Sequence, residues 1–309
     1  MSGSDVRKRE PDFRSLISGF GIGHVGVCSF SALLPLFENR SKGRLPDNPR
    51  SVIVCALPYF SGEYPRRNVA RYAVCDDYHN TGGALLGEIS GRLAEAFPGY
   101  VFVPFIDVSP IPEVKAARLA GLGTIGLHGQ LILPGWGAYV FIGCIVTDLL
   151  LEPSPVVSGP CPQCEACIKA CPTNALTRNG LRRELCRSYI TQKRGKLTPW
   201  EENEVRAGKM AWGCDICLDA CPRNQTSAIT DLECMRRSPL PVIGMDNLDE
   251  AITRKAYGFR GRKVLERNLQ LTNNACHPEP FVCHPGPFSC HSERSEESLR
   301  AQGKLREGS

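Results

Sequence analysis

The spacing of the cysteines constrains this chain more than any other feature of its sequence. Four of the sixteen cysteines follow the pattern C-x2-C-x2-C-x3-C-P, which is the ligand spacing of bacterial proteins that hold two iron–sulfur clusters. In that pattern the fourth cysteine ligates the other cluster, so the chain must supply a second set of thiols. A second run, CDICLDACP, supplies three, and Cys186 between the two runs supplies one more.

The crossing of the fourth cysteine in each run predicts which thiols belong together. One [4Fe-4S] cluster is expected on Cys161, Cys164, Cys167 and Cys221, and the other on Cys171, Cys186, Cys214 and Cys217. Pairs of the form C-x2-C also bind zinc. The four-cysteine run followed by proline favours iron–sulfur clusters over zinc. Electron transfer is therefore the first function that the sequence indicates.

Compartment and membrane association follow from the apolar segments. The N-terminus lacks an apolar signal region, and the longest apolar run, residues 139–151, is too short for a membrane helix. We therefore expect a cytoplasmic protein without a membrane partner, where thiols stay reduced and disulfides are disfavoured. The net charge of +5 indicates little about partners, because ligating thiolates with two oxidised clusters would add about −4. Five further cysteines are expected to be non-ligands: Cys28, Cys55, Cys75, Cys144 and Cys234.

Hydrophobic patterning predicts a mixed α/β fold of the α+β type. Strands are expected at 25–30, 51–57, 100–106, 131–133 and 139–147, and helices at 11–20, 81–97, 112–121 and 247–271. We divide the chain into an α/β domain (1–154), a double-cluster module like bacterial ferredoxin (155–235), a short helical segment (236–272) and a low-complexity tail (273–309). The tail repeats a Cys-His unit every seven residues. Its proline-rich composition favours disorder over a metal-binding tract.

Two glycine patterns fit G-x-G-x-x-G, at residues 21–26 and 121–126. A dinucleotide site needs this pattern after a strand and before a helix, whereas here each one follows a helix and leads towards a strand. Tight turns that need positive φ are therefore the simpler interpretation. The second loop is alternatively a place where the backbone approaches a large cofactor closely.

Asp107 is the acidic residue with the most suggestive position. It ends a predicted strand, where open α/β sheets place ligand-binding residues. Partial burial there would raise the pKa of its carboxyl, so that it could donate a proton. The alternative is a structural role, in which Asp107 accepts hydrogen bonds in the turn at Ser109-Pro110.

Basic residues are concentrated in two places, and each is either a phosphate-binding patch or a solvated face. The first lies between the cysteine runs and contains Arg178, Arg182, Arg183, Arg187, Lys193, Arg194 and Lys196. The second contains Arg254, Lys255, Arg260, Arg262, Lys263 and Arg267.

Over about residues 12–270 the chain resembles the epoxyqueuosine reductases. The resemblance rests on both cysteine runs and on SVIVCALPY (51–59), RYAVCDDYH (71–79), IDVSPIPE (106–113), AGLGTIG (120–126), CRSYIT (186–191) and GRKVLERN (261–268). It implies a reductase that depends on iron–sulfur clusters and cobalamin and that converts epoxyqueuosine to queuosine in tRNA. Cobalamin would lie between the α/β domain and the cluster module, and the clusters would pass electrons singly to its cobalt.

The resemblance also implies roles for single residues and partners. The proton donor of the family falls on Asp107, and the partners would be tRNA and a small electron-donor protein. The positions that match cobalamin contacts are Arg71, Tyr72, Tyr78, His79, Gly123, Gly126, Ser188 and Tyr189.

The sequence departs from the family pattern at three places. Val114 stands where the family usually has arginine, and Leu127 and His128 follow Gly126 where the family often has Gly-Lys-Asn or Gly-Lys-His. Residues 236–272 resemble only the beginning of a HEAT-like helical extension that helps bind tRNA, which puts tRNA binding in doubt. Two alternatives therefore stay open: a related cobalamin-dependent reductase of a small molecule, like the reductive dehalogenases, and a non-catalytic two-cluster electron carrier.

Overall fold

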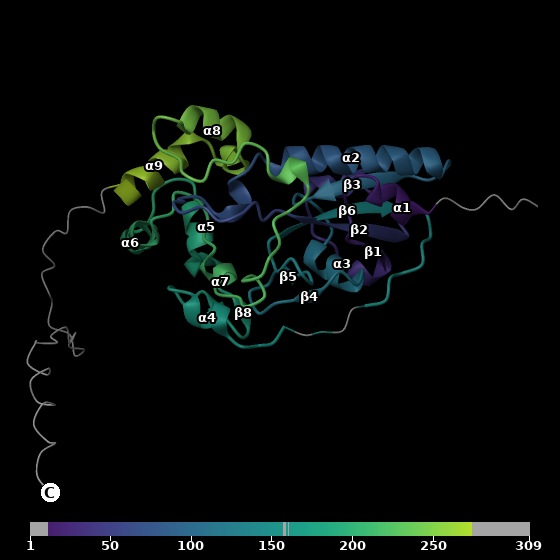
Figure 1. Cartoon of the computed structure of the whole chain (residues 1–309), viewed down its shortest axis with the longest axis horizontal. Coiled ribbons are helices and arrows are strands. Elements are labelled where there is room, and N and C mark those ends of the chain that lie inside the picture. The colour runs from purple at the N-terminus through teal and green to yellow at the C-terminus, as the bar shows by residue number, and fades with distance from the viewer. Residues whose placement is uncertain (1–11, 157–158, 160, 274–309) are drawn as a thin grey trace, which may run out of the picture. The chain divides into compact units, whose positions relative to one another are not determined.

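A four-stranded antiparallel sheet organises the first half of the chain in the computed structural model, which describes residues 12–156, 159 and 161–273 (Figure 1). Its strands stand in the order β1 (Val25–Ser29), β2 (Ser51–Pro58), β6 (Val140–Thr147) and β3 (Phe102–Ile106). Every neighbouring pair is antiparallel. The four strands were predicted close to these positions, and the mixed α/β fold class is confirmed.

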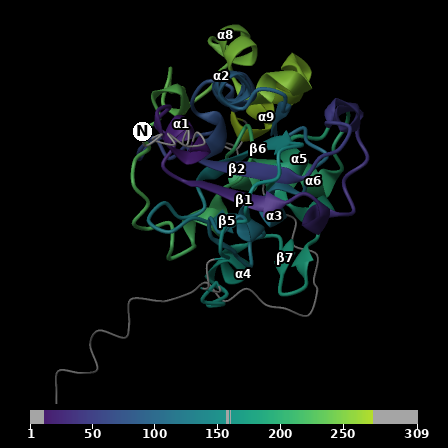
Figure 2. The same cartoon turned by 90° about the vertical axis from the view of Figure 1, so that its right-hand side faces the viewer.

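Helices cover both faces of this sheet, and the alternation of β2 explains how. Ile53, Cys55 and Leu57 point to the face covered by α1 (Phe13–Ser18) and α2 (Tyr78–Ala96). Val52 and Val54 point to the opposite face, which α3 (Glu113–Leu119) covers. Both faces of the strand are therefore buried, as its unbroken apolar sequence predicts. Figure 2 shows β1 and β2 between α2 on one side and α3 on the other.

Helix α2 begins earlier than the sequence predicted. Thr81 was the expected N-cap, but Asp77 caps the helix, and its carboxylate accepts a hydrogen bond from the His79 backbone N–H. The hydroxyl of Thr81 instead donates to the Asp77 carbonyl within the first turn. The earlier start places Tyr78 and His79 in the first turn of α2, next to the end of β3.

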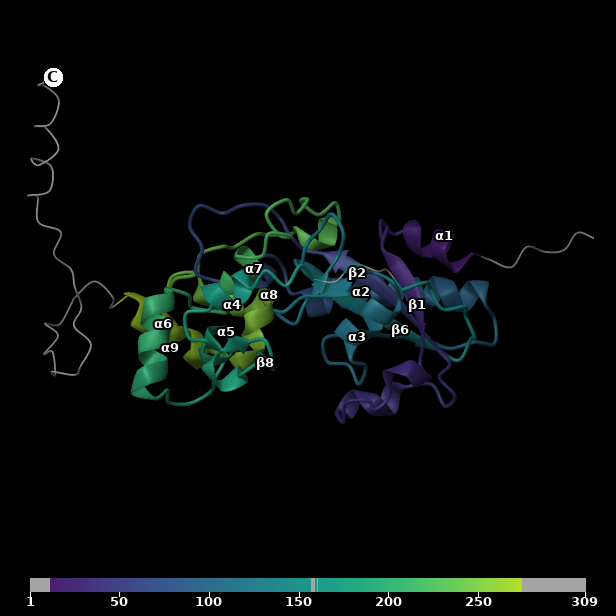
Figure 3. The ribbon, with the colours of Figure 1, turned by 90° about the horizontal axis from the view of Figure 1, so that it is seen from below.

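The cysteine-rich region is built from short elements. They are α4 (Ala166–Ala170), β7 (Leu176–Thr177), β8 (Gly180–Leu181), α5 (Arg187–Thr191), α6 (Pro199–Gly208) and α7 (Ile216–Asp219). Helix α6 has a capping box, in which Thr198 and Glu201 satisfy each other's backbone N–H groups, with Pro199 as its first residue. Figure 3 shows α4, α5 and α6 on one side of the described chain and the sheet on the other.

The predicted helix at 247–271 is two helices, α8 (Leu248–Arg254) and α9 (Arg262–Asn273). Helix α8 ends before Lys255, whose backbone is extended (φ −109°, ψ 153°), and Gly261, with a φ of 81°, directly precedes α9. Buried Asn268 on α9 donates to the carbonyls of Thr191 (2.7 Å) and Ala211 (2.8 Å), which fixes α9 against the cysteine-rich region.

The remaining regular elements are short. They are β4 (Thr124–Ile125), β5 (Leu131–Ile132) and the 3-10 helices η1 (Ser31–Leu33), η2 (Arg40–Arg44), η3 (Arg71–Ala73), η4 (Arg183–Leu185), η5 (Glu233–Met235) and η6 (Ala256–Arg260). The hydrophobic core under α2 also contains Leu232, Met235 and Ala256, so packing extends across the segment boundaries that we predicted at residues 154 and 235. Those boundaries stay a prediction. The Cys-His repeat lies outside the described residues.

None of the helices in the described ranges combines the length and the apolar character needed to cross a bilayer.

Candidate active site

A cavity of about 460 Å³ lies between the sheet and the cysteine-rich region. One wall comes from the sheet side and includes Tyr72, Tyr78, Asp107 and Phe141. The opposite wall contains all four cysteines of one predicted set: Cys171, Cys186, Cys214 and Cys217. Residues that are far apart in the sequence therefore meet at one site, and that site combines thiols with an acid.

Among the predicted ligands, the thiols whose charges affect one another's pKa values belong to the same predicted set. Burial raises the pKa of Cys221, and negative charge on Cys161 and Cys164 raises it further. Burial likewise raises the pKa of Cys217 to about 12, with added contributions from thiols of its own set, Cys214, Cys186 and Cys171. The fourth cysteine of each run thus lies with the other run, as the spacing predicts.

The cysteines are not gathered around a single point. Among the described residues, no three side chains of Cys, His, Asp or Glu lie close enough together to hold one metal ion. In a [4Fe-4S] cluster each thiolate binds a different iron atom, so its four ligands stand farther apart than those of a single ion. The two ligand sets stay a prediction that this geometry supports.

Backbone conformation brings the first run of cysteines together. Gln163 (φ 51°) and Glu165 (φ 60°) adopt left-handed conformations between the cysteines, and α4 begins directly afterwards. Such conformations reverse the chain over few residues and are costly for residues other than glycine. The five cysteines expected to be non-ligands lie elsewhere, and four of them, Cys28, Cys55, Cys75 and Cys144, are buried.

Asp107 lies at one end of a chain of three polar side chains, with His79 at the centre. Its Oδ2 is 2.9 Å from Nε2 of His79, and Nδ1 of His79 is 2.7 Å from Oδ1 of Asp77. Asp107 has a left-handed backbone with φ of 59°, directly after β3. Strained conformations of this kind are concentrated at functional sites. The rule for parallel sheets that drew attention to Asp107 does not apply to this antiparallel sheet, but the residue faces the cavity nevertheless.

The expected direction of the Asp107 pKa was wrong. The hydrogen bond from His79 lowers the pKa of Asp107 below its ordinary value and outweighs the opposing effect of burial. Burial would lower the pKa of His79, but its hydrogen bonds with Asp107 and Asp77 raise it to about 9. At neutral pH the proton therefore resides on His79, between two carboxylates, and Asp107 is ionised.

Two further residues of the cavity were not predicted as site residues. Oε1 of Glu113 and Nε2 of His128 are buried without a hydrogen-bond partner among the described residues. Burial, together with the charge of Asp107, raises the pKa of Glu113 to about 8, and burial lowers the pKa of His128 to about 4. Both are thus uncharged at neutral pH and offer polar atoms to a ligand. The spacing D-x-x-P-x-x-E was the signal that could have identified Glu113.

The residues that the resemblance assigned to cobalamin are only partly brought together. Tyr72, Tyr78 and Ser188 line the cavity. His79 does not line the cavity but contacts Asp107, which does. The Tyr189 ring lies under the guanidinium of Arg183, whose Cζ is 4.5 Å from the ring centroid.

Close neighbours within the chain explain why glycine stands at positions 123 and 126 of the second loop. A Cβ atom on Gly123 would lie 2.2 Å from the Ile132 carbonyl oxygen, and one on Gly126 would lie 2.6 Å from the His128 ring. Gly21 and Gly121 have φ values of 81° and 74°. Both glycine patterns therefore form tight turns, as expected.

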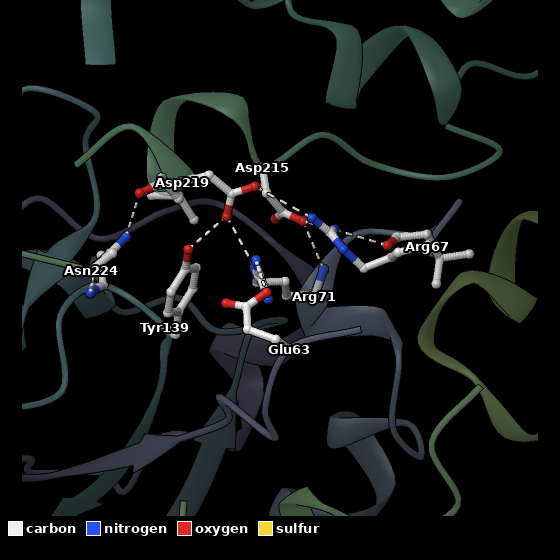
Figure 4. Close-up of polar contacts among 10 residues, drawn as sticks. Glu63, Arg67, Arg71, Tyr139, Asp215, Asp219 and Asn224 are labelled. Carbon is white, nitrogen blue, oxygen red and sulfur yellow. Dashed lines mark hydrogen bonds and ion pairs between the residues drawn. The ribbon is translucent and has the colours of Figure 1, made fainter. Parts of the chain in front are cut away.

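Arg71 belongs to a network that joins the sheet side to α7 (Figure 4). Its backbone N–H donates to Asp215 (2.8 Å), and its side chain donates to Asp219 (3.0 Å) and Glu63 (3.0 Å). Arg67 pairs with buried Asp215, and the Tyr139 hydroxyl donates to Asp219 (2.7 Å). Because Asp215 and Asp219 flank Cys217, this network fixes Cys217 relative to the sheet.

Part of each basic concentration is neutralised within the protein. Arg187 pairs with Glu204, and Lys193 pairs with Glu201. In the second concentration the internal ion pairs are Arg254 with Glu250 and Asp76, Lys255 with Asp76, and Arg262 with Asp249 and Glu266. These contacts give the paired residues a structural role. The remaining members have no carboxylate partner among the described residues: Arg182, Arg183, Arg194, Lys196, Arg260, Lys263 and Arg267.

Two family models match the chain over these same regions. Residues 160–224 match a model described as a 4Fe-4S double cluster binding domain, and residues 42–108 match one described as epoxyqueuosine reductase QueG. The first covers all eight predicted ligands, and the second contains Arg71, His79 and Asp107.

Curated relatives carry the same name. The epoxyqueuosine reductase of Aliivibrio fischeri is 32% identical over 225 residues, which are 69% of this chain and 60% of that protein. The one of Listeria monocytogenes is 30% identical over 254 residues, which are 76% of this chain and 66% of that protein. The chain thus spans about 60% of the length of the curated relatives that it matches.

Solved structures share the fold. The epoxyqueuosine reductase of Streptococcus thermophilus matches with a TM-score of 0.73 and 20% identity, over 86% of this chain and 81% of that one. An epoxyqueuosine reductase solved with an epoxyqueuosine-modified stem loop of tRNA-Tyr matches with a TM-score of 0.73 and 22% identity, over 84% of this chain and 79% of that one. The chain therefore shares its fold with these solved structures.

Proposed function

We propose that this chain, which belongs to the epoxyqueuosine reductase family, is a cytoplasmic oxidoreductase that converts epoxyqueuosine to queuosine in tRNA. One observation carries this proposal: Asp107 and one full set of predicted cluster ligands face each other across a single cavity. A substrate there would meet electrons from one wall and protons from the other. The relatives named epoxyqueuosine reductase, and the one solved with a modified tRNA stem loop, support the choice of substrate.

The proposed reaction needs electrons from one wall of the cavity and protons from the other. Converting an epoxide to an alkene breaks both carbon–oxygen bonds, takes up a pair of electrons and a pair of protons, and releases the oxygen as water. We assign the electrons to the two [4Fe-4S] clusters, which transfer them one at a time from a small electron-donor protein. The cluster on Cys171, Cys186, Cys214 and Cys217 would be the nearer one to the substrate, because these cysteines line the cavity.

The cavity suits cobalamin as the group between the clusters and the substrate. Its lining is mostly apolar and aromatic, with a few polar atoms, as is typical of cofactor sites. Tyr72, Tyr78 and Ser188 would hold the cofactor, and the unpartnered atoms of Glu113 and His128 would provide hydrogen bonds. When bound, cobalamin supplies a cobalt centre that the clusters can reduce to a strong nucleophile.

Both protons would pass through Asp107 from His79, which would take up the second one from water after giving up the first. Asp107 is ionised at rest, because His79 holds the proton between Asp107 and Asp77. When negative charge develops on the substrate oxygen, His79 can release its proton through Asp107, and Asp77 then retains the imidazole in place. The strained backbone of Asp107 aims its carboxylate into the cavity without displacing β3.

Substitution of Asp107 tests this proposal. Full-length protein reconstituted with clusters and cobalamin should convert epoxyqueuosine in tRNA to queuosine, as detected by mass spectrometry. Asp107→Asn should lower turnover by about 100-fold or more while iron content and the cobalamin spectrum stay unchanged. Asparagine also tolerates positive φ, so the backbone should be preserved. Asp47→Asn, at an exposed site, is the matched control.

Two results would contradict the proposal in different ways. If the fully loaded wild type leaves epoxyqueuosine unchanged, the substrate is wrong. If Asp107→Asn turns over at the wild-type rate, Asp107 has no part in the mechanism.

A second candidate is a related cobalamin-dependent reductase of a small molecule. Val114 favours it, because this apolar side chain lines the cavity where the family usually has arginine. Tight, salt-dependent binding of tRNA would count against it. A third candidate, a non-catalytic electron carrier, should bind no cobalamin, so the absorbance spectrum of the purified protein distinguishes it.

A further inference from the structure

A second hollow adjoins the cavity on the other side of Asp107. It is an open groove of about 510 Å³. Its lining includes Arg40, Arg44, His79, Pro104, Ile106 and Val108. Ile106 lines both the groove and the cavity, and His79 reaches Asp107 from the groove side. The hydrogen-bonded pair of Asp107 and His79 therefore stands at the boundary between the two hollows.

The two arginines of this groove are not neutralised. Both are exposed on η2, and in the described part of the chain neither forms an ion pair with a carboxylate. Arg44 donates to the Pro104 carbonyl (2.9 Å) and lies 4.8 Å from the centroid of the Phe105 ring. Lys42 between them is paired with Glu38 (2.6 Å). Some arginines of the two basic concentrations described above also lack a carboxylate partner in the described residues, so Arg40 and Arg44 are distinguished by their position in the groove beside Asp107.

An exposed aromatic residue precedes the arginines. The Phe37 side chain is 58% exposed. In proteins that bind single-stranded nucleic acid, aromatic faces stack on bases while basic side chains contact the phosphates. Residues 37–44 thus carry both kinds of side chain, and Arg40 and Arg44 among them line the groove.

These residues are attached to the loop that carries Asp107. The Phe37 backbone N–H donates to the Pro110 carbonyl (2.8 Å), and the Asn39 amide donates to the Ser109 carbonyl (2.8 Å). The Arg44 contact with Pro104 attaches the other end of residues 37–44 to β3, directly before this loop. Asn39 also caps η2, because its Oδ1 accepts a hydrogen bond from the Ser41 N–H (2.9 Å). A partner bound by residues 37–44 would therefore be held in a fixed position relative to Asp107.

We propose that residues 37–44 bind the RNA strand beside the nucleoside that enters the cavity, with Arg40 and Arg44 on its phosphates and Phe37 stacked on a neighbouring base. This inference rests on the proposed function, because only a substrate within a polymer brings phosphates to the mouth of the cavity. A nucleoside that reacts in such a cavity must leave the stack, so the flanking backbone passes over the opening. The groove lies on the side of Asp107, whereas an electron-donor protein should dock near the cysteines, where Cys164 is exposed.

Binding of a fluorescent tRNA anticodon stem–loop to the cluster-loaded full-length protein tests the proposal over a range of salt concentrations. Each phosphate contact in single-stranded nucleic acid contributes a slope of about 0.7 to the dependence of log Kd on log salt concentration. The double variant Arg40→Ala/Arg44→Ala should therefore bind more weakly and lower this slope by about 1.4. Arg66→Ala/Arg92→Ala removes the same charge from exposed sites elsewhere and should leave the slope unchanged.

Two single variants separate binding from folding and stacking from charge. Arg40→Ala removes a side chain with no hydrogen bond to the described part of the protein, so it should lower the slope by about 0.7 without affecting iron content. Phe37→Ala should weaken binding while leaving the slope unchanged, because stacking releases no counterions.

The proposal is overturned if the arginine variants bind the stem–loop like the wild type, or if both double variants lose the same affinity. It is also overturned if the arginine variants lose binding of the electron-donor protein instead of RNA. Wild-type protein that reduces epoxyqueuosine while the Arg40 and Arg44 variants retain their RNA affinity would refute this inference and leave the proposed function intact. Conversely, if the slope changes as expected but the protein leaves epoxyqueuosine unreduced, the proposed function is refuted and the RNA-binding inference stands.

Discussion

The sheet and the cysteine-rich region differ in what holds them together. The two central strands, β2 and β6, bury apolar side chains on both faces, and the helices that cover them bring their own apolar faces. The cysteine-rich region has a small apolar core of its own, around Ile190, Leu197 and Val205, and its α4 and α7 have five and four residues. Helices so short are not stable alone. One region is thus a hydrophobic scaffold, whereas the short helices that carry the cysteines depend on ion pairs, on the predicted clusters and on the packing of Ala211 and Trp212 against α8 and α9.

This difference indicates where function is carried. A scaffold that is stable by itself can hold Asp107 in a strained conformation, because the surrounding packing determines the backbone. A region that depends on its ligands can be completed only after the clusters are inserted, since structural metal sites contribute directly to folding. The two regions should therefore respond differently to the same kind of substitution.

The largest contrast is expected from removal of one predicted cluster ligand. Cys217→Ala should lower the iron content from about eight to about four atoms per chain and make residues around α7 sensitive to protease. The sheet should keep its structure, because none of its strands contains a predicted ligand. Iron analysis and limited proteolysis measure both effects. Cys234→Ala, a half-buried cysteine outside both sets, should retain full iron, and full iron in Cys217→Ala would remove that residue from the ligand set.

The ion pairs between the two regions should have the next largest effect. Arg67→Ala leaves the buried carboxylate of Asp215 without its cationic partner, which typically costs about 3 kcal/mol. We expect the free energy of unfolding in urea to fall by about that amount. Arg92→Ala, which breaks an exposed pair with Glu95, should cost at most about 0.5 kcal/mol. Equal losses in the free energy of unfolding of the two variants would show that the contact with α7 contributes no more than an exposed ion pair.

The smallest effect concerns pH and the scaffold side alone. The pKa of His79 is raised from 6.5 to about 9, so protonated His79 stabilises the fold fully below pH 6.5, and this stabilisation is lost as the pH rises through 9. Because Asp107 is partly exposed, we expect a loss of about 1 kcal/mol. His79→Gln should abolish this dependence in urea unfolding between pH 6.5 and 9. His24→Gln should leave it unchanged, and a slope that persists in His79→Gln would assign the effect to another group.

Sequence patterns predicted the features that depend on residues close together in the chain. The strands followed from apolar runs such as residues 51–57, and the pairing of Cys221 with the first run followed from spacing alone. The pKa of Asp107 was not predictable, because it depends on His79, which α2 brings in from 28 residues away. The pairing of Arg67 with Asp215 spans 148 residues and has no sequence signal. The helical stretch at 247–271 was also predicted, although its division at Lys255 and Gly261 was not.

The order of the sheet along the chain has a consequence for how the protein is made. All four strands lie between Val25 and Thr147, so the last of them leaves the ribosome before Cys161 does. Because chains fold from the N-terminus during synthesis, the strands can begin to pair while the cysteines of the second run are still unsynthesised. The crossing of the cysteines then delays both clusters, since one set needs Cys217 and the other needs Cys221. The core under α2 is completed later still, because Leu232, Met235 and Ala256 follow both runs, so iron would be delivered in a single late step, while the packing of the sheet is being completed.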